Sequence, residues 1–103
     1  TIKSDTSREM MAYAARVGLE LGADIIKLKY GGNADDLKWA VKCAGKTKVV
    51  IAGGPPITEA QILKQSSDIM KAGAIGLAVG RNVWQNSHPK EITRKIKKII
   101  WKK

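Results

Sequence analysis

The sequence predicts an α/β fold in which parallel strands alternate with outer helices. Three short apolar runs each lead into a glycine-rich turn, and stretches with helical periodicity lie before, between and after them. Strands that are joined by helices must run parallel, and their crossovers are right-handed. The order of elements is therefore αβαβαβα, and the length of 103 residues predicts one domain.

The first helix and strand are predicted from their end signals. Thr6 and Glu9 have the spacing of a capping box, which predicts a helix start there, and Gly22 is expected to end the helix. A strand is predicted over residues 25–29, followed by a loop over 30–32.

The second helix and strand follow the same plan. Asn33 is predicted to cap a helix that Gly45 ends. Residues 48–52, with Val-Val-Ile at their centre, are predicted to form a strand that opens into the turn 53–56.

The third unit begins with another capping box, formed by Thr58 and Gln61, and its helix is expected to stop at Gly73. A third strand is predicted over residues 74–79, and a short helical turn is predicted to run through Trp84.

The last helix is predicted to begin at Pro89, because proline suits the first turn. Its isoleucines fall on one stripe, with basic residues opposite. Two interpretations of this basic face are open: a solvated helix surface, or a surface that attracts nucleic acid or a phosphorylated small molecule. The basic residues that crowd this end of a chain with a formal net charge of +10 are Lys90, Arg94, Lys95, Lys97, Lys98, Lys102 and Lys103.

The composition argues against several classes of site. With one cysteine, Cys43, and one histidine, His88, the chain has no internal disulfide, and no metal site is expected. No apolar run approaches the roughly 20 residues that span a bilayer, so we expect no membrane partner. Because the single cysteine allows no internal disulfide, we expect the reducing cytoplasm as the location. The three tryptophans are predicted to pack helices against the sheet: Trp39, Trp84 and Trp101.

Polar and glycine residues follow each predicted strand, and the carboxyl ends of parallel strands meet at one rim, where ligands collect in α/β folds. Glycines at such a rim let backbone N–H groups approach an anion closely. Either these glycines form a phosphate site or they merely turn the chain. The rim candidates are Lys27, Lys29, Gly53, Gly54, Gly80 and Arg81.

Lys27 stands in the middle of a predicted strand, where a charged side chain is unexpected unless it has a function. A neutral lysine can attack a carbonyl and form an imine. Lys29 lies on the same face, about 6.6 Å away, and charge repulsion of about 2.5 kcal/mol would favour the neutral amine. The alternative is an edge strand that carries lysines to prevent aggregation.

Three stretches, AARVGLELGADIIKLKYGG, VVIAGGPP and AGAIGLAVGRNVWQ, closely resemble the archaeal-type class I fructose-1,6-bisphosphate aldolases. These are Schiff-base enzymes with a (βα)8 TIM-barrel fold, and the resemblance covers nearly the whole chain. It implies that Lys27 is the Schiff-base lysine near the end of barrel strand 6. It also implies a substrate phosphate site from two turns: Gly53 and Gly54 after strand 7, with Gly80 and Arg81 after strand 8.

The resemblance implies that residues 1–103 are the C-terminal part of a single TIM-barrel aldolase domain, comprising helix 5 and βα units 6 to 8. The first five strands and the family's catalytic tyrosine lie outside the match, and Tyr30 does not match that tyrosine. We therefore expect the isolated chain to be inactive, and the complete protein to be a homo-oligomer without a cofactor.

The implied activity is reversible cleavage of fructose 1,6-bisphosphate to dihydroxyacetone phosphate and glyceraldehyde 3-phosphate, in glycolysis and gluconeogenesis. One alternative within the family is a transaldolase-like 2-amino-3,7-dideoxy-heptulosonate synthase. Another, of a different class, is a basic nucleic-acid-binding module, which is not expected because the last helix lacks interleaved aromatic residues.

Overall fold

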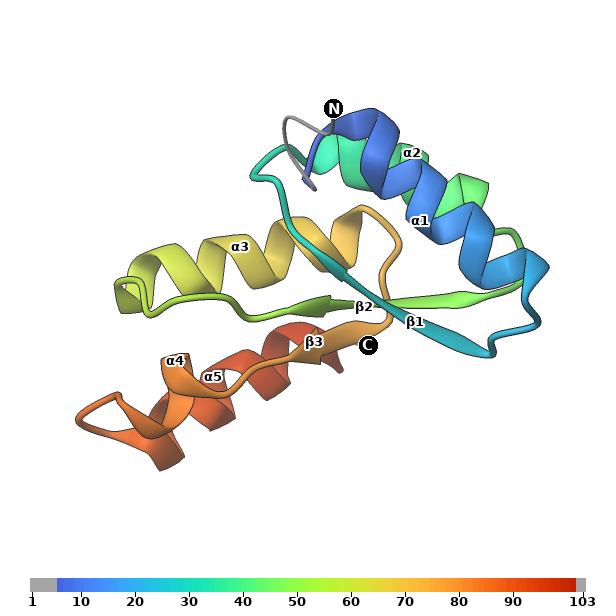
Figure 1. The fold of residues 1–103 in the computed structure, drawn as a ribbon. Helices are drawn as coiled ribbons and strands as arrows, with labels where there is room; N and C mark the ends of the chain where they lie inside the picture. Colours follow the sequence, from blue (N-terminus) through green and yellow to red (C-terminus); the bar gives the residue numbers. More distant parts are fainter. Residues whose placement is uncertain (1–5, 102–103) are drawn as a thin grey trace.

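The alternation of helices and strands is confirmed in the computed structural model, which describes residues 6–101 (Figure 1). The elements in chain order are α1 (Arg8–Glu20), β1 (Ile25–Lys29), α2 (Ala34–Cys43), β2 (Lys48–Ala52), α3 (Glu59–Lys71), β3 (Gly76–Ala78), α4 (Arg81–Trp84) and α5 (Pro89–Ile100).

The strands form one parallel sheet in the order β1-β2-β3, with β2 in the centre. In its register, Lys27 lies beside Val50, which lies beside Gly76. All carboxyl ends reach the same edge of the sheet (Figure 1). The turns after β2 and β3 are thus neighbours, as the parallel prediction requires.

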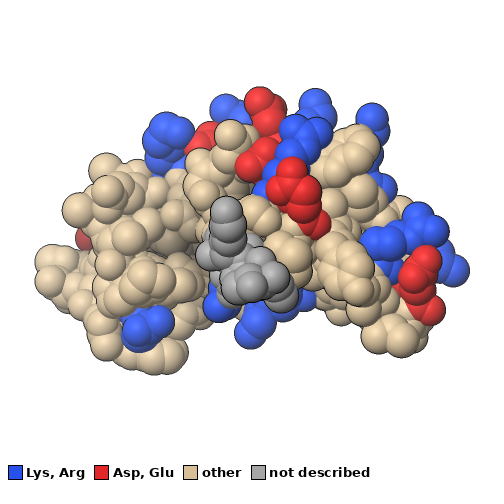
Figure 2. Space-filling view, turned by 45° about the horizontal axis from the view of Figure 1, so that its top comes forward, with Lys and Arg blue, Asp and Glu red and all other residues tan. Residues whose placement is uncertain are grey.

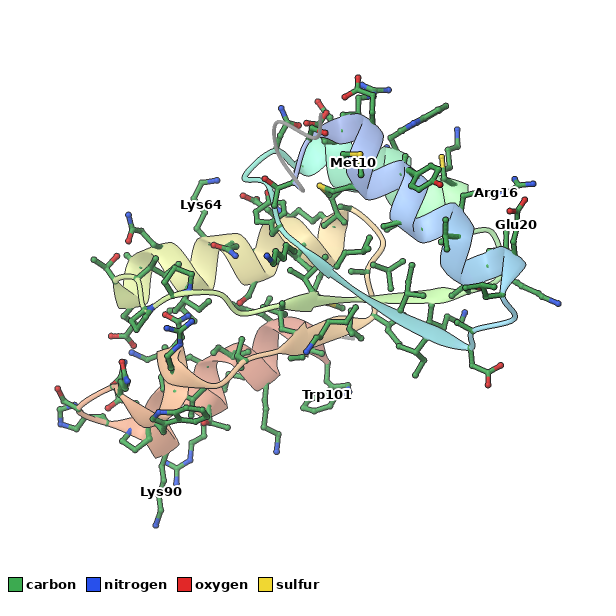
Figure 3. All side chains as sticks on the ribbon, viewed as in Figure 1. Met10, Arg16, Glu20, Lys64, Lys90 and Trp101 are labelled. Carbon is green, nitrogen blue, oxygen red and sulfur yellow. The ribbon has the colours of Figure 1, made fainter. Side chains whose placement is uncertain are left out.

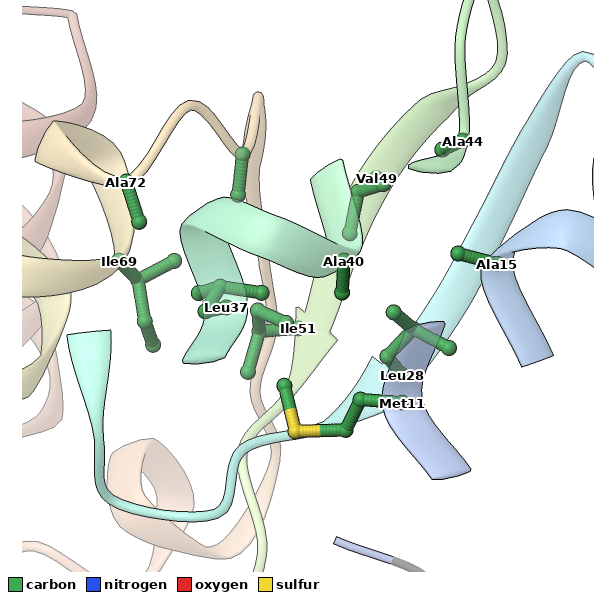
Figure 4. Packing of buried hydrophobic residues seen from close by; sticks show 11 residues of the cluster. Met11, Ala15, Leu28, Leu37, Ala40, Ala44, Val49, Ile51, Ile69 and Ala72 are labelled. Atoms are coloured by element: carbon green, nitrogen blue, oxygen red, sulfur yellow. The ribbon is translucent and has the colours of Figure 1, made fainter. Parts of the chain in front are cut away.

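One face of the sheet is covered by α1, α2 and α3. The strands contribute Leu28, Val49 and Ile51 to this core, and Ile51 at the centre is 0% exposed. Fully burying one such side chain contributes about 1.5–3 kcal/mol, so this layer is the main source of stability. The helices and their C-caps contribute both small and large apolar side chains (Figure 4): Met11, Ala15, Leu37, Ala40, Ala44, Ile69 and Ala72.

The opposite face of the sheet is open. Because successive side chains of a strand point to opposite faces, it carries the alternate set of residues. Lys27 and Lys48 are exposed there, Ile25 is 57% exposed and Val50 is half-buried. A side chain built onto Gly76 would meet no atom within 4 Å. Within residues 6–101, no helix covers this face.

A second apolar cluster joins α3 to α5. Ile62 of α3 packs against Ile92 and Ile96 of α5, and all three are buried. At the rim of this contact the Nζ of Lys95 lies 2.7 Å from an oxygen of Glu59 and 3.4 Å from one of Glu91. The isoleucine stripe predicted for the last helix therefore packs on α3.

Two of the three predicted helix caps are confirmed, and so is the start of the last helix at Pro89. Asn33 accepts hydrogen bonds from the N–H groups of Asp35 and Asp36, and Thr58 forms the reciprocal capping box with Gln61. The prediction for the first helix is wrong by one residue, because the N-cap is Ser7, whose hydroxyl accepts from the N–H of Met10.

The third strand is shorter than the predicted 74–79. Ile75 donates its N–H to the carbonyl of Val49, and the N–H of Gly53 donates to the carbonyl of Ala78, so pairing with β2 extends beyond the regular strand at both ends. Within the described residues β3 pairs on one side only, with β2, and its regular part is Gly76–Ala78.

The predicted packing of the tryptophans against the sheet is wrong. Trp84 and Trp101 are 69% and 66% exposed, and Figure 3 shows Trp101 pointing outward beyond the end of α5. Trp39 is 44% exposed and carries the guanidinium of Arg8 at 5.2 Å from its ring centroid. The ring of Trp84 lies over Gly80, and none of the three tryptophans is buried against the sheet.

Candidate functional site

The turn after β2 is packed tightly against the end of β3. A Cβ atom on Gly53 would lie 2.9 Å from Cγ1 of Val79 and 3.0 Å from its Cα, closer than real Cβ contacts allow. Gly54 follows with a φ of +68°, a left-handed conformation that favours glycine. The Gly53–Gly54 pair is therefore required by both a close approach and the backbone conformation.

The turn after β3 presents backbone donors at the same edge. The carbonyl of Gly80 accepts hydrogen bonds from the N–H groups of Val83 and Trp84, which closes the short helix α4. Within residues 6–101 the N–H groups of Gly54, Gly80 and Arg81 donate to no partner. Adjacent N–H groups in such turns can bind an anion.

A pocket of about 480 Å³ lies at this edge of the sheet. It brings together four of the six residues predicted from the sequence: Lys29, Gly53, Gly54 and Arg81. Gly80 lies next to Arg81 in the chain, and Lys27 lies outside the pocket lining, on the open face. The other residues around the pocket are Thr6, Tyr30, Ala52, Pro55, Ile57 and Gln65.

Lys27 stands on the open face, two residues before the carboxyl end of β1. Residues that lie side by side on neighbouring strands form a row across this face. The neighbours of Lys27 across the sheet are Val50 and then Gly76, while the last row is formed by Lys29, Ala52 and Ala78. Rows on one face are about 6.6 Å apart, and adjacent strands about 4.8 Å apart. Small side chains on β2 and β3 thus leave room for a ligand between Lys27 and the glycine turns.

Tyr30 is a pocket residue whose ionisation is perturbed. Partial burial raises the pKa of its hydroxyl, and the nearby carboxylate of Asp68 raises it further. Asp68 also accepts a hydrogen bond of 2.7 Å from the Nζ of Lys64, which raises the pKa of that ammonium group. The Tyr30 hydroxyl therefore stays protonated at neutral pH.

Asn82 is a residue that the sequence analysis missed. Its side chain is 5% exposed, and its Nδ2 donates to the carbonyls of Gly53 and Pro55 at 3.1 and 3.2 Å. Its Oδ1 accepts from the N–H of Ile57 at 2.8 Å. The sequence carries one signal for it, an asparagine directly after a Gly-Arg pair at the rim, but its partners are far away in the chain.

The other charged residues of the described part, 6–101, include the basic residues predicted on the last helix, of which Lys102 and Lys103 lie outside that part. Figure 2 shows acidic side chains lying among basic ones on the face that it displays. On α5, Lys90, Arg94, Lys97 and Lys98 are exposed, as a solvated helix face would be. In the part of the chain that is described, no three His, Cys, Asp or Glu residues gather as metal ligands would, and no helix is long and apolar enough to cross a membrane.

Comparisons with known proteins find aldolases and a related synthase. Residues 1–86 match the family described as DeoC/LacD family aldolase. The class 1 fructose-bisphosphate aldolase of Thermoproteus tenax is 46% identical over 101 residues. A solved Schiff-base-forming fructose-1,6-bisphosphate aldolase superposes with a TM-score of 0.94 at 45% identity, covering 98% of this chain and 41% of that one. The 2-amino-3,7-dideoxy-D-threo-hept-6-ulosonate synthase 1 of Archaeoglobus fulgidus is 38% identical over 96 residues, which are 93% of this chain and 35% of that protein.

These matches cover nearly all of this chain but a much smaller share of each relative. The Thermoproteus match covers 97% of this chain but 38% of the relative. The chain thus spans about two fifths of the length of the proteins that it matches.

The contact between the two turns yields a prediction. Gly53→Ala should destabilise the chain by about 1–3 kcal/mol, because the new Cβ collides with Val79 and must push the turns apart. Gly76→Ala is the matched control, since its Cβ would meet open space. Urea denaturation of both variants measures the difference, and equal losses of stability would contradict the close approach.

Proposed function

The chain belongs to the DeoC/LacD family of aldolases, and we propose that within a complete barrel it acts as a class I fructose-1,6-bisphosphate aldolase. The observation that carries the proposal is the shared edge of the sheet: Lys27 stands on the open face, and two turns with unpartnered N–H groups lie next to it. Small residues separate them, so one phosphorylated ketose can reach both.

The amine of Lys27 is the proposed nucleophile. Its Nζ attacks the carbonyl carbon of the ketose, and the resulting carbinolamine loses water to give an iminium ion. The iminium accepts the electron pair of the breaking carbon–carbon bond. The hydroxyl on the far carbon of that bond loses its proton and becomes a carbonyl, so that this fragment leaves as glyceraldehyde 3-phosphate. Protonation of the enamine and hydrolysis then release dihydroxyacetone phosphate and regenerate the lysine. None of the described residues is assigned to these proton transfers.

The two turns are proposed to hold the phosphate. The N–H groups of Gly54, Gly80 and Arg81 would donate to its oxygens, and the guanidinium of Arg81 would supply the countercharge. The N–H of Gly53 is not assigned to the phosphate, because it already donates to the carbonyl of Ala78. Lys29, two residues beyond Lys27, lines the same pocket and adds positive charge to it.

We further propose that β1, β2 and β3 are strands 6 to 8 of a (βα)8 barrel, and that α1, α2, α3 and α5 are its outer helices 5 to 8. The superposition at a TM-score of 0.94 over two fifths of a solved aldolase supports this placement. In a barrel the face that carries Lys27 would line the interior, and additional strands would pair with the edges of β1 and β3. The complete protein is proposed to be a homo-oligomer.

A second candidate is the heptulosonate synthase activity, which the match to the Archaeoglobus protein favours. The nucleophile and the phosphate turns would be shared between the two reactions. The identity of 46% to a fructose-bisphosphate aldolase, against 38% to the synthase, supports the first candidate.

Covalent trapping tests the nucleophile in a chimaeric enzyme, in which this chain replaces the matching segment of the Thermoproteus aldolase. Incubation with dihydroxyacetone phosphate and borohydride should reduce the imine to a stable adduct on Lys27, found by peptide mass spectrometry. Lys27→Met should abolish both the adduct and the cleavage of fructose 1,6-bisphosphate.

Lys48→Met is the matched control, because Lys48 stands on the same open face at the opposite end of the neighbouring strand. It should leave trapping intact. A folded chimaera that forms its adduct on a lysine other than Lys27 would refute the assignment. A chimaera that traps the substrate but cleaves fructose 1,6-bisphosphate poorly would favour the synthase.

The barrel proposal predicts the behaviour of the 103-residue chain by itself. Without a general acid–base group, which contributes about 10²–10⁴-fold, it should cleave fructose 1,6-bisphosphate at least about 100-fold more slowly than the chimaera. A coupled assay of the purified chain measures this ratio. Turnover equal to that of the chimaera would show that residues outside the chain are not needed.

A further inference from the structure

The side chain of Asn82 joins two parts of the molecule that are distant in the chain. It belongs to α4, whose four residues follow the Gly80 turn, and its hydrogen-bond partners all lie in the connection from β2 to α3. The three bonds span 25, 27 and 29 residues. With 5% exposure, the amide is buried among these backbone atoms.

The loop from β2 to α3 needs the amide of Asn82, because the loop has few backbone N–H donors of its own. Pro55 and Pro56 have no N–H group, so this part of the loop cannot form a regular turn through its own donors. Both protons of the Asn82 amide go to carbonyls of the loop, and its oxygen receives the N–H of Ile57. A buried carbonyl or N–H left without such a partner would cost about 1–3 kcal/mol.

One of these bonds fixes the direction of a proposed phosphate donor. The carbonyl of Gly53 and the N–H of Gly54 belong to the same planar, trans peptide group, in which the C=O and N–H bonds point in opposite directions. When Asn82 holds the Gly53 oxygen, it also aims the Gly54 N–H away from itself. A glycine pair could otherwise rotate this peptide at little cost, because glycine populates both signs of φ.

We propose that Asn82 is a positioning residue that sets the orientation of the Gly54 N–H and holds the two glycine turns together as one phosphate-binding unit. The inference rests on the phosphate role proposed for the turns. Asn82 has no direct contact with the phosphate in this account, because its amide hydrogens and its oxygen are already engaged by the loop.

Two substitutions in the 103-residue chain separate positioning from general stability. Asn82→Ala removes all three bonds. Asn82→Asp keeps an acceptor for the Ile57 N–H but removes both donors, so the Gly53 peptide is released while the Ile57 bond can remain. Gln85→Ala is the matched control, because Gln85 is an exposed amide residue directly after α4 with no hydrogen bond from its side chain in the described residues.

The first measurement is a titration with inorganic phosphate, followed by the NMR shifts of backbone amides. In the wild-type chain and in Gln85→Ala, phosphate should shift the resonances of Gly54, Gly80 and Arg81. In Asn82→Ala the dissociation constant should rise at least about tenfold, as expected for the loss of one oriented donor to a charged group. A folded Asn82→Ala chain that binds phosphate as tightly as the wild type overturns the proposal.

The second measurement, hydrogen exchange without phosphate, tests positioning independently of the phosphate role. The spectra recorded for this exchange experiment also give the chemical shift of the Gly54 amide. Asn82→Asp should change that chemical shift while the Ile57 N–H stays protected from exchange. Asn82→Ala should change both the Gly54 chemical shift and the Ile57 protection. Unchanged Gly54 and Ile57 amides in the variants overturn the proposal, even if Asn82→Ala proves too unstable to titrate. A wild-type chain that binds no phosphate but shows these exchange changes refutes the phosphate role and leaves Asn82 as the residue that orients the turn.

Discussion

The alternation of side chains along three parallel strands is the constraint on which the rest of the structure depends. Because each strand points successive residues to opposite faces, the helices that bury Leu28, Val49 and Ile51 leave Lys27 on the other side. A shift of the register by one residue would bury the lysine and expose the core. Stability and the proposed chemistry are thus assigned to separate faces of the same strands.

The turns at the carboxyl edge depend on that sheet in a second way. Parallel strands bring residues 53–54 and 80–81 together although they are far apart in the chain, and the Gly53–Ala78 hydrogen bond continues the pairing into the turns. Close packing against Val79 explains why residue 53 is glycine, and the left-handed backbone explains residue 54. Asn82 donates to the carbonyls of Gly53 and Pro55, which joins the loop after β2 to α4.

Much of this could be predicted from the sequence, because the signals are local. The strands were found from β-branched runs that end in glycine, and the caps at Asn33 and Thr58 from residues a few positions apart. The first cap was misplaced because Thr6 and Ser7 both offer a hydroxyl before the same helix. Asn82 could not be assigned a role from the sequence for another reason: its hydrogen-bond partners are 25 to 29 residues away in the chain. The exposure of the tryptophans likewise depends on how the helices pack, which the local sequence does not show.

The central claim is that Lys27 and the two glycine turns act on one ligand, and a crystal structure of the borohydride-reduced adduct in the chimaera tests it most directly. The account predicts a covalent bond from the Nζ of Lys27 to the former carbonyl carbon. It also predicts that the phosphate of the same molecule lies within about 3 Å of the N–H groups of Gly54 and Arg81. A phosphate bound elsewhere, with these N–H groups facing solvent, would contradict it.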